Sequence, residues 1–298
     1  MNRPNLFIVG APKCGTTTLY YWLKSHPDIF MSPVKEPPFF DRDIRLDAGR
    51  FFTEERYLGL FAKAGAQRYR GESHVWNLYS REAAAKIRAF SPDAKIIVML
   101  RNPLEVITSM YHYNVYGLLE NQPTLAAALA LETERKAGRS IPATCYLHDR
   151  LFYRDTVRYA EQVRRYLAAF PPEQVHVIVY DDLKKDAPGV VRRLLEFLDL
   201  PAEGWQPDFA TRNKGVTFRS RLLRFWSEYP PFWAAWPGKL LPAAGRKFVY
   251  KVVNRLNAKP FKAPPMPADV RENLKNELRD DVAALGQLLG RDLDFWMK

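Results

Sequence analysis

Cysteine is scarce in this sequence, and long apolar runs are missing. Only Cys14 and Cys145 occur, which excludes a disulfide framework and a cysteine-based zinc cluster. No stretch approaches the roughly 20 apolar residues that a membrane-spanning helix needs. The apolar run at residues 6–9 is too short for the core of a signal peptide, and Gly and Pro follow it. We therefore expect a soluble chain in the reducing cytoplasm.

Acidic residues are outnumbered by basic ones, 33 against 45, so that the formal net charge is +12. A positive field raises the local concentration of anions and favours an anionic ligand or substrate. The basic residues are scattered and form no known nucleic-acid-recognition motif, so we expect no nucleic-acid partner. The spacing of His, Cys and Asp residues implies no metal site. The sequence leaves the oligomeric state open.

Three apolar runs are each followed by a segment with helical periodicity. The strand-and-helix units are expected at residues 5–9 and 16–24, 95–100 and 103–116, and 175–180 and 187–198. Apolar strands that alternate with helices are typical of a parallel sheet covered on both faces. The sequence therefore predicts an α/β fold, a P-loop-like doubly wound parallel sheet flanked by helices. A length of 298 residues fits one domain, residues 1–298.

The remaining segments are predicted to form further helices and one distinct subregion. Helical periodicity occurs at residues 124–137, 150–170 and 267–289, and Leu293, Phe295 and Trp296 are expected to anchor the segment that follows. Residues 201–265 are instead rich in proline, aromatic and basic residues, which predicts a lid or a substrate-facing, partly helical subregion. The basic and aromatic side chains at 218–255 also fit a peripheral membrane contact, although packing is the commoner role of such stripes.

The loop after the first predicted strand has the character of an anion site. Gly10 and Gly15 flank a turn that opens into a helix, where unpaired backbone N–H groups and the helix dipole attract phosphate or sulfate. The spacing of the two glycines is that of a nucleoside-triphosphate P-loop. However, Thr16 stands where that motif has its lysine, and the lysine is at position 13. This loop is therefore not arranged to hold β- and γ-phosphates with Mg²⁺.

With this loop, the chain resembles the sulfotransferases that depend on 3′-phosphoadenosine-5′-phosphosulfate (PAPS). Their first loop reads much like Pro-Lys-x-Gly-Thr-Thr-x-Leu, and here it is Pro12-Lys13-Cys14-Gly15-Thr16-Thr17-Thr18-Leu19. The resemblance implies transfer of the sulfuryl group from PAPS to a hydroxyl or amine, with release of adenosine-3′,5′-bisphosphate (PAP). It also implies that residues Lys13, Cys14, Gly15, Thr16, Thr17 and Thr18 bind the 5′ end of the nucleotide. Lys13 would further act in catalysis by neutralising charge on the departing bridging oxygen.

The same resemblance implies a site for the 3′-phosphate. The family places an Arg at a later strand end and a Ser in the following helix, and this sequence has Arg101 and Ser109. A guanidinium fork suits bidentate phosphate recognition. Arg212, Lys214 and Gly215 resemble the late Lys-Gly loop of the family, which closes over the same phosphate, although a solvated basic turn explains them equally well.

The general base is expected on the acceptor side. In the carbohydrate and heparan sulfate branch a Glu ahead of a Phe-Phe pair has this role, which points to Glu36 before Phe39-Phe40. The small-molecule branch uses a His instead, for which His74, His112 and His148 are the candidates. A carbohydrate acceptor is therefore favoured over a phenolic or lipid hydroxyl. Glu72 stands where heparan-type enzymes carry a Lys beside the serine, which argues against a polyanionic acceptor.

Two functions of other classes remain open from the sequence. A P-loop kinase or NTPase would use the predicted strand 175–180 and its following Asp181-Asp182 to bind Mg²⁺, but the displaced lysine counts against it. A non-enzymatic module would keep the nucleotide loop without turnover. The acceptor itself is not encoded in the nucleotide motifs.

Overall fold

The computed structural model describes residues 2–47, 49–201, 204–209, 216–228, 243–261 and 263–298. Five parallel strands form the central sheet, in the order β2 (Ile29–Met31), β3 (Tyr69–Ser73), β1 (Leu6–Gly10), β4 (Lys95–Leu100) and β5 (Val175–Val179). Every residue of β1 is fully buried, and so are the last five of β4, because both strands are covered on two faces. The predicted doubly wound α/β fold is confirmed.

Two strands of the sheet were not predicted. β2 is only three residues long, and β3 has the sequence Tyr-Arg-Gly-Glu-Ser, so neither presents an apolar run. They pair closely because Gly71 has no side chain: a Cβ there would lie 2.4 Å from the sulfur of Met31. The three predicted strands are confirmed, with a small change at β5, which ends at Val179 because Tyr180 begins α10 (Tyr180–Lys185).

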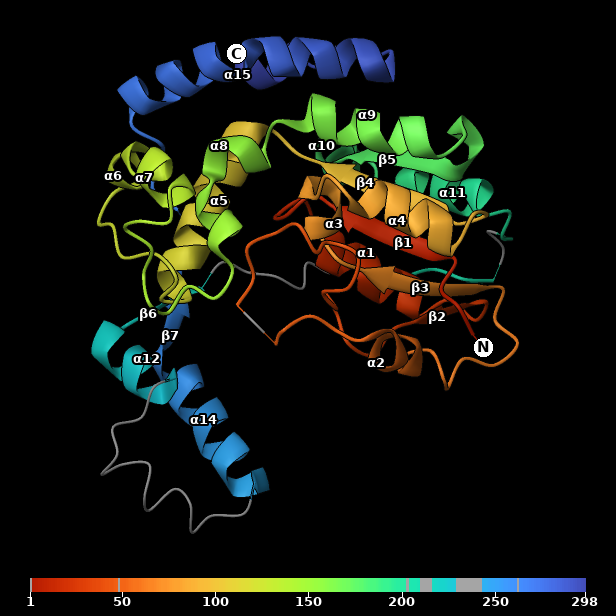
Figure 1. Ribbon diagram of the computed structural model, residues 1–298, viewed down its shortest axis with the longest axis horizontal. Coiled ribbons are helices and arrows are strands. Elements are labelled where there is room, and N and C mark those ends of the chain that lie inside the picture. The colour runs from red at the N-terminus through yellow and green to blue at the C-terminus, as the bar shows by residue number, and fades with distance from the viewer. Residues whose placement is uncertain (1, 48, 202–203, 210–215, 229–242, 262) are drawn as a thin grey trace.

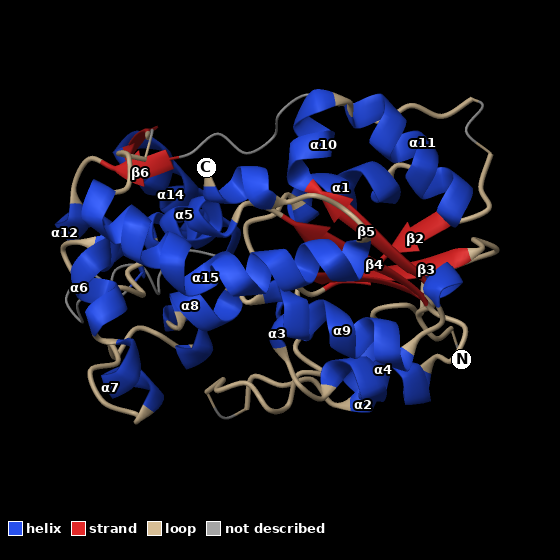
Figure 2. Ribbon diagram, turned by 90° about the horizontal axis from the view of Figure 1, so that it is seen from above, coloured by secondary structure: helices blue, strands red, loops and turns tan. Residues whose placement is uncertain are grey.

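Helices cover both faces of the sheet (Figures 1 and 2). One face carries α1 (Thr16–Lys24), α10 and α11 (Ala187–Phe197), and the other carries α3 (Trp76–Tyr79), α4 (Ala83–Phe90) and α9 (Tyr159–Ala169). The long helix α15 (Ala268–Leu289) packs on α9 as an outer layer and ends at Gly290, whose φ of 59° suits glycine. Leu293 and Trp296 are buried after it, as predicted, whereas Phe295 is exposed.

The helices predicted at 124–137 and 150–170 are both interrupted. The first is α6 (Leu125–Ala130) followed by α7 (Glu132–Lys136). The second comprises the end of η1 (His148–Leu151), α8 (Tyr153–Thr156) and α9. Between α8 and α9 the Gln162 side chain donates to the carbonyl oxygens of Asp155 and Thr156, at 3.0 and 3.2 Å. These bonds satisfy carbonyl groups at the end of α8 and stabilise the break.

A second group of elements lies beyond the sheet around α5 (Pro103–Tyr116), on the left of Figure 1. It includes α6, α7, α8 and η1, together with β6 (Val216–Phe218), α12 (Arg221–Glu228), α14 (Ala243–Asn257) and β7 (Ala258–Pro260), and the antiparallel pair β6–β7 joins its C-terminal part. The short elements α2 (Glu54–Gly59), η2 (Pro172–Gln174) and η3 (Asp294–Met297) complete the described chain.

The subregion predicted at 201–265 falls partly outside the described residues. Within it α12 and α14 expose apolar side chains, with Leu222 at 58% and Leu256 at 70%. The roles of lid and membrane contact both stay predictions. In the described part of the chain, no helix combines the length and the apolar character needed to cross a bilayer.

Candidate active site

A cavity of about 810 Å³ lies at the carboxyl ends of β1 and β4. Its walls come from the β1–α1 loop, Glu36, α5, Arg150 and Tyr180, and from the segment 263–266 before α15. In open parallel sheets ligands bind at this edge, in the crevice beside the central strands. The topology therefore brings together residues that are far apart in the sequence.

The β1–α1 loop has a backbone that exposes N–H groups to the cavity. Gly15 precedes α1 with a φ of 94°, and a Cβ there would lie 3.1 Å from the Tyr180 ring. Among the described residues no side chain caps α1, which leaves N–H groups of its first turn for a ligand. Thr16, Thr17 and Thr18 also line the cavity. This is the geometry of a phosphate or sulfate site.

Lys13 points into the same cavity from a strained position. Its φ is 63°, a left-handed conformation that is costly outside glycine and is found most often at functional sites. Its ammonium lies 4.3 Å from the ring centre of Tyr113. Burial lowers the pKa of Lys13, and the Glu36 carboxylate raises it only in part. Repulsion from Arg101 and Arg150 lowers the pKa further. A bound anion would relieve this repulsion.

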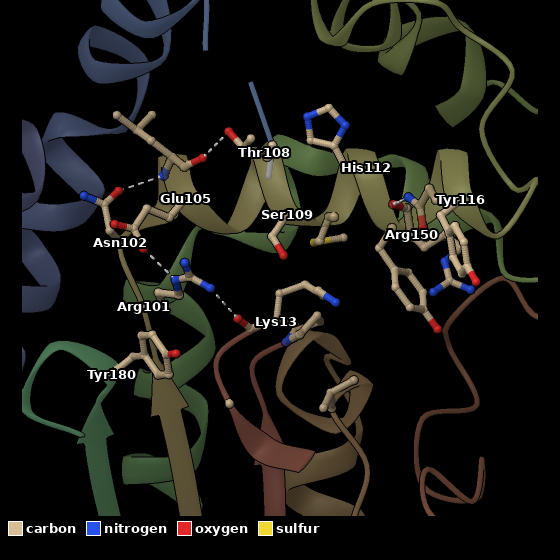
Figure 3. Close-up of a pocket in the computed structure, with 18 of the residues that line it drawn as sticks. Lys13, Arg101, Asn102, Glu105, Thr108, Ser109, His112, Tyr116, Arg150 and Tyr180 are labelled. Carbon is tan, nitrogen blue, oxygen red and sulfur yellow. Dashed lines mark hydrogen bonds and ion pairs between the residues drawn. The ribbon is translucent and has the colours of Figure 1, made fainter. Parts of the chain in front are cut away.

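Arg101 and Ser109 face the cavity on the other side of the loop (Figure 3). The Arg101 guanidinium donates to the Lys13 carbonyl oxygen at 3.3 Å and to Glu105 Oε2 at 2.7 Å. It also lies 4.8 Å from the Tyr180 ring centre. Ser109 projects from α5 between Arg101 and Lys13. The first of these bonds ties the Arg101 guanidinium to the backbone of the loop that carries Lys13.

The start of α5 is fixed by Asn102. Its Oδ1 accepts from the N–H of Leu104 at 2.9 Å, and its Nδ2 donates to the Trp296 carbonyl oxygen at 3.1 Å. Pro103 occupies the first helical position, where its missing N–H is harmless. Asn102 thus links the helix that carries Ser109 to the segment after α15.

The Cys14 side chain points away from the cavity, into the core. It is fully buried, with its sulfur 3.4 Å from the Pro12 carbonyl oxygen and 3.9 Å from the Tyr159 hydroxyl. Burial raises the pKa of the Cys14 thiol to about 12. Since this side chain packs in the core and is not part of the cavity wall, a contact of Cys14 with a nucleotide would have to come from its backbone, and its predicted role stays a prediction. The other predicted residues Arg212, Lys214 and Gly215 lie outside the described residues.

Glu36 stands at the cavity wall, also with a left-handed backbone. Its φ is 61°, and its N–H donates to the Ser73 carbonyl oxygen at 2.8 Å. Its carboxylate is 2.7 Å from the Lys35 ammonium, with 42% of the side chain exposed. Enclosure by the cavity works to raise the pKa of Glu36, but Lys35 and other cations outweigh it and the pKa is lowered. Glu36 is therefore a carboxylate at neutral pH.

The three candidate histidines lie in different surroundings. His112 lines the cavity, and burial lowers its pKa, so that it is neutral at pH 7. His74 is 3% exposed behind the wall and bonds Asp41 Oδ2 at 2.6 Å. Burial works to lower the pKa of His74, but Asp41 more than offsets this. His148 lies 3.9 Å from Asp47, away from the cavity. Of the three, only His112 faces the site.

Several cavity residues had no signal in the sequence. Tyr113, Arg150 and Tyr180 belong to no motif, and α5, η1 and α10 bring them to the site. A helical spacing from Ser109 could have suggested Tyr113, but nothing local marks Arg150. No group of three or more His, Cys, Asp and Glu side chains in the described part of the chain could hold a metal ion.

The two acids proposed for a kinase-type Mg²⁺ site are already engaged. Asp181 accepts from the Trp296 indole N–H at 2.9 Å and pairs with Lys184 at 2.7 Å. Asp182 pairs with the Arg291 guanidinium, with one bond of 2.7 Å. These contacts fasten α10 to the segment after α15 and give both carboxylates a structural role.

Comparison with known proteins identifies similar chains. Mouse carbohydrate sulfotransferase 15 is 27% identical over 246 residues, which cover 66% of this chain and 44% of that protein. Mouse heparan sulfate glucosamine 3-O-sulfotransferase 6 is 30% identical over 197 residues, 66% of this chain and 52% of that protein. The chain thus spans about half the length of these curated relatives. The crystal structure of a sulfotransferase from Alicyclobacillus acidocaldarius superposes with a TM-score of 0.75 at 29% identity, and all of both chains is covered.

The family relationship rests on a match over the greater part of the sequence. Residues 3–214 match the model of the sulfotransferase domain, a range that includes β1 to β5 and the cavity loops at Lys13, Glu36 and Arg101. This match decides against the kinase and NTPase interpretation. The chain belongs to the sulfotransferase domain family.

Proposed function

We propose that this enzyme transfers the sulfuryl group of PAPS to a hydroxyl or amine of a carbohydrate. The observation that carries the proposal is the convergence of Lys13, Arg101 and Glu36 on one cavity from three separate loops. In the transfer, the bond from sulfur to the bridging oxygen of PAPS breaks and a bond from sulfur to the acceptor atom forms. The electron pair leaves with the bridging oxygen of PAP, and the acceptor proton goes to the Glu36 carboxylate.

The donor would lie along the β1–α1 loop and the start of α5. In this arrangement Lys13 and the N–H groups of α1 hold the 5′-phosphosulfate, and Arg101 and Ser109 hold the 3′-phosphate. Such transfer passes through a loose in-line transition state, by analogy with phosphoryl transfer, so positioning and charge neutralisation supply most of the catalysis. The ammonium of Lys13 would stabilise negative charge on the departing oxygen.

The acceptor class is supported by the relatives, which are named for carbohydrate and heparan sulfate substrates. Glu36 is ionised at neutral pH and faces the cavity, as a base that accepts a hydroxyl proton must be. The alternative, a phenolic or lipid acceptor with a histidine base, would use His112, which is neutral at pH 7 and also faces the cavity.

Nucleotide binding is tested by thermal unfolding with PAP and with ATP·Mg²⁺. PAP at 100 times its dissociation constant should stabilise the protein by about 2.7 kcal/mol, and ATP·Mg²⁺ should stabilise it far less.

Arg101→Ala should weaken PAP binding by about ten-fold or more, because a charge-assisted hydrogen bond is lost. The matched control Arg164→Met, on the exposed face of α9, should bind PAP like the wild type. Stabilisation by ATP·Mg²⁺ alone would contradict the proposal.

The base is tested by Glu36→Gln, measured as transfer of ³⁵S from labelled PAPS to a panel of glycans. We expect transfer to fall by at least about 100-fold, because the amide cannot accept the proton, while PAP affinity stays within a few-fold. His112→Gln is the matched comparison and should keep most of the activity. If Glu36→Gln retains activity and His112→Gln loses it, the base is the histidine. PAP binding without turnover on any acceptor would favour the non-enzymatic module.

The shifted pKa values of Glu36 and Lys13 predict the pH profile of kcat/KM. Glu36 must be deprotonated, and its pKa lies below its ordinary value of 4.5, so the base should cause no loss of activity between pH 5 and 8. Lys13 must be protonated, and its pKa lies below its ordinary value of 10.5, so activity should fall as the pH rises toward 10. Lys13→Arg should move this alkaline limb upward. An acidic limb near pH 6 that His112→Gln abolishes would contradict the assignment.

A further inference from the structure

Arg150 is a buried cation that forms no ion pair with a carboxylate of the described residues. Its side chain lines the cavity, and the residue is 9% exposed. One guanidinium nitrogen donates to the Tyr146 hydroxyl at 3.2 Å, while Nε is buried without a hydrogen-bond partner among the described residues. No carboxylate of those residues lies within ion-pair distance of it. A buried charge of this kind is costly unless a partner compensates it.

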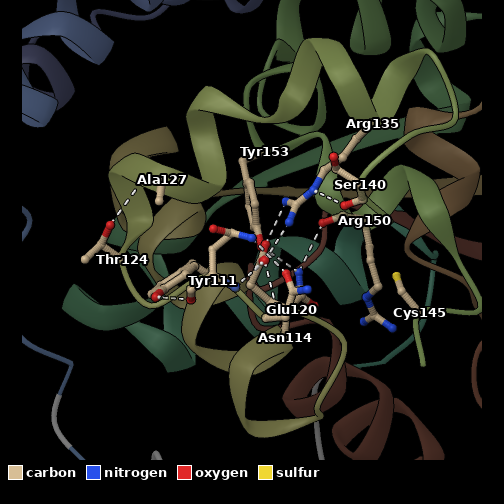
Figure 4. A network of polar contacts seen from close by, with 12 residues as sticks. Tyr111, Asn114, Glu120, Thr124, Ala127, Arg135, Ser140, Cys145, Arg150 and Tyr153 are labelled. Carbon is tan, nitrogen blue, oxygen red and sulfur yellow. Dashed lines mark hydrogen bonds and ion pairs between the residues drawn. The ribbon is translucent and has the colours of Figure 1, made fainter. Parts of the chain in front are cut away.

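A second buried arginine shows how the fold satisfies such a charge when its role is structural (Figure 4). Arg135, fully buried, donates to both oxygens of Glu120 at 2.8 and 2.6 Å. The Tyr153 hydroxyl donates to the same carboxylate at 2.9 Å. Arg135 thus has a bidentate carboxylate partner, whereas Arg150 has no such partner in the part of the chain that the structure describes. The contrast leaves the Arg150 guanidinium available to an anion that enters the cavity.

Arg150 is held in place independently of any partner. The Asn114 amide donates to the Arg150 carbonyl oxygen at 3.1 Å and to the Tyr153 hydroxyl at 3.2 Å, which connects Arg150 to the Glu120–Arg135 pair. The rings of Tyr113 and Tyr146 flank the guanidinium, with centres 5.5 and 5.7 Å away. A preorganised guanidinium loses little entropy on binding an anion.

The position of Arg150 separates it from the proposed nucleotide contacts. In Figure 3, Arg101 and Tyr180 lie on one side of Lys13, and Arg150 and Tyr116 lie on the other. If the nucleotide extends from Arg101 to Lys13, the acceptor enters from the side of Arg150. The charge of Arg150 contributes to lowering the pKa of Glu36, so the guanidinium lies within electrostatic reach of the proposed base.

We propose that Arg150 binds a carboxylate or sulfate group of the acceptor, close to the hydroxyl or amine that receives the sulfuryl group. The acceptor would then be an acidic or already sulfated sugar. The planar guanidinium fork matches either anion in a bidentate way. This inference rests on the proposed function, since it assigns a specificity-determining residue to that same site.

The acid at position 72 does not oppose this proposal. Glu72 is 1% exposed and accepts from the Tyr57 hydroxyl at 2.6 Å and the Asn77 amide at 3.0 Å. Burial raises its pKa to about 7. Because Glu72 lies behind the cavity wall, it presents no negative charge to an acceptor. The buried Glu72 therefore does not repel an anionic acceptor, although this chain still lacks the lysine that heparan-type enzymes carry at this position.

The test measures binding and sulfation of three matched glycosides in the presence of PAP or PAPS. The probes are p-nitrophenyl β-D-glucuronide, p-nitrophenyl β-D-glucoside 6-sulfate and the neutral p-nitrophenyl β-D-glucoside. The wild type should prefer at least one anionic probe over the neutral one by about ten-fold or more, and Arg150→Met should abolish that preference. The two anionic probes distinguish a carboxylate partner from a sulfate partner. Equal binding of all three, or no saturable binding of either anionic probe at tens of millimolar, would overturn the proposal.

Variants separate recognition from stability. Arg150→Met leaves no anion unpaired, so the Tm of this variant should equal or exceed that of the wild type. Arg135→Met leaves the buried Glu120 carboxylate without its ion-pair partner and should lower Tm by roughly 10 °C. Arg150→Lys, which keeps the charge, should keep part of the preference. Tyr146→Phe, which keeps the guanidinium, should retain the preference in full. A large loss of Tm in Arg150→Met with an unchanged acceptor preference would make the residue structural.

The outcome is distinguishable from a failure of the proposed function. PAP affinity and Glu36-dependent sulfation report on the function, while the ratio of anionic to neutral acceptor reports on Arg150. Arg150→Met should leave PAP affinity within a few-fold of the wild type. If it instead weakens PAP as much as Arg101→Ala does, Arg150 belongs to the nucleotide site and the inference is wrong.

Discussion

The fold holds several cations around one cavity, where they repel one another. The rest of this site depends on that repulsion. Lys13, Arg101 and Arg150 reach the cavity from three different elements, and their mutual repulsion contributes to lowering the pKa of Lys13. Among the described residues, Glu105 pairs with Arg101, and Glu36 pairs with Lys35 beside the cavity. A bound polyanion would offset this repulsion, and its binding would then stabilise the site.

Backbone strain accompanies this charge arrangement. Five non-glycine residues in the described part of the chain have a left-handed φ, and two of them are Lys13 and Glu36. Each such position costs of order 1–3 kcal/mol and persists when its surroundings fix it. Here the burial of β1 and the bond from Glu36 N–H to the Ser73 carbonyl oxygen supply that support. The rigid sheet thus holds a lysine and a glutamate in conformations that short loops alone would not keep.

The sequence predicted those parts of the structure that local patterns encode. β1, β4 and β5 are apolar runs, and the loop at Lys13 is a contiguous motif, so both were found. β3 escaped prediction because Arg70 and Glu72 interrupt its apolar character, and its burial follows from long-range pairing with β1 and β2. The burial of the Cys14 side chain could not be predicted, because a motif does not say which way a side chain points. Arg150 was missed because its position at the cavity wall depends on α5 and η1, which only the tertiary fold brings together.

The bond between Asn102 and the Trp296 carbonyl oxygen has a consequence for biosynthesis. The five strands and α5 are complete once the chain has been translated to Val179, but the cavity also needs residues 263–266, and Asn102 needs Trp296. Domains fold as units while they emerge from the ribosome. Because Leu278 of α15 and Trp296 also belong to the buried core, both the core and the cavity are completed only after the residues up to Trp296 have left the ribosome.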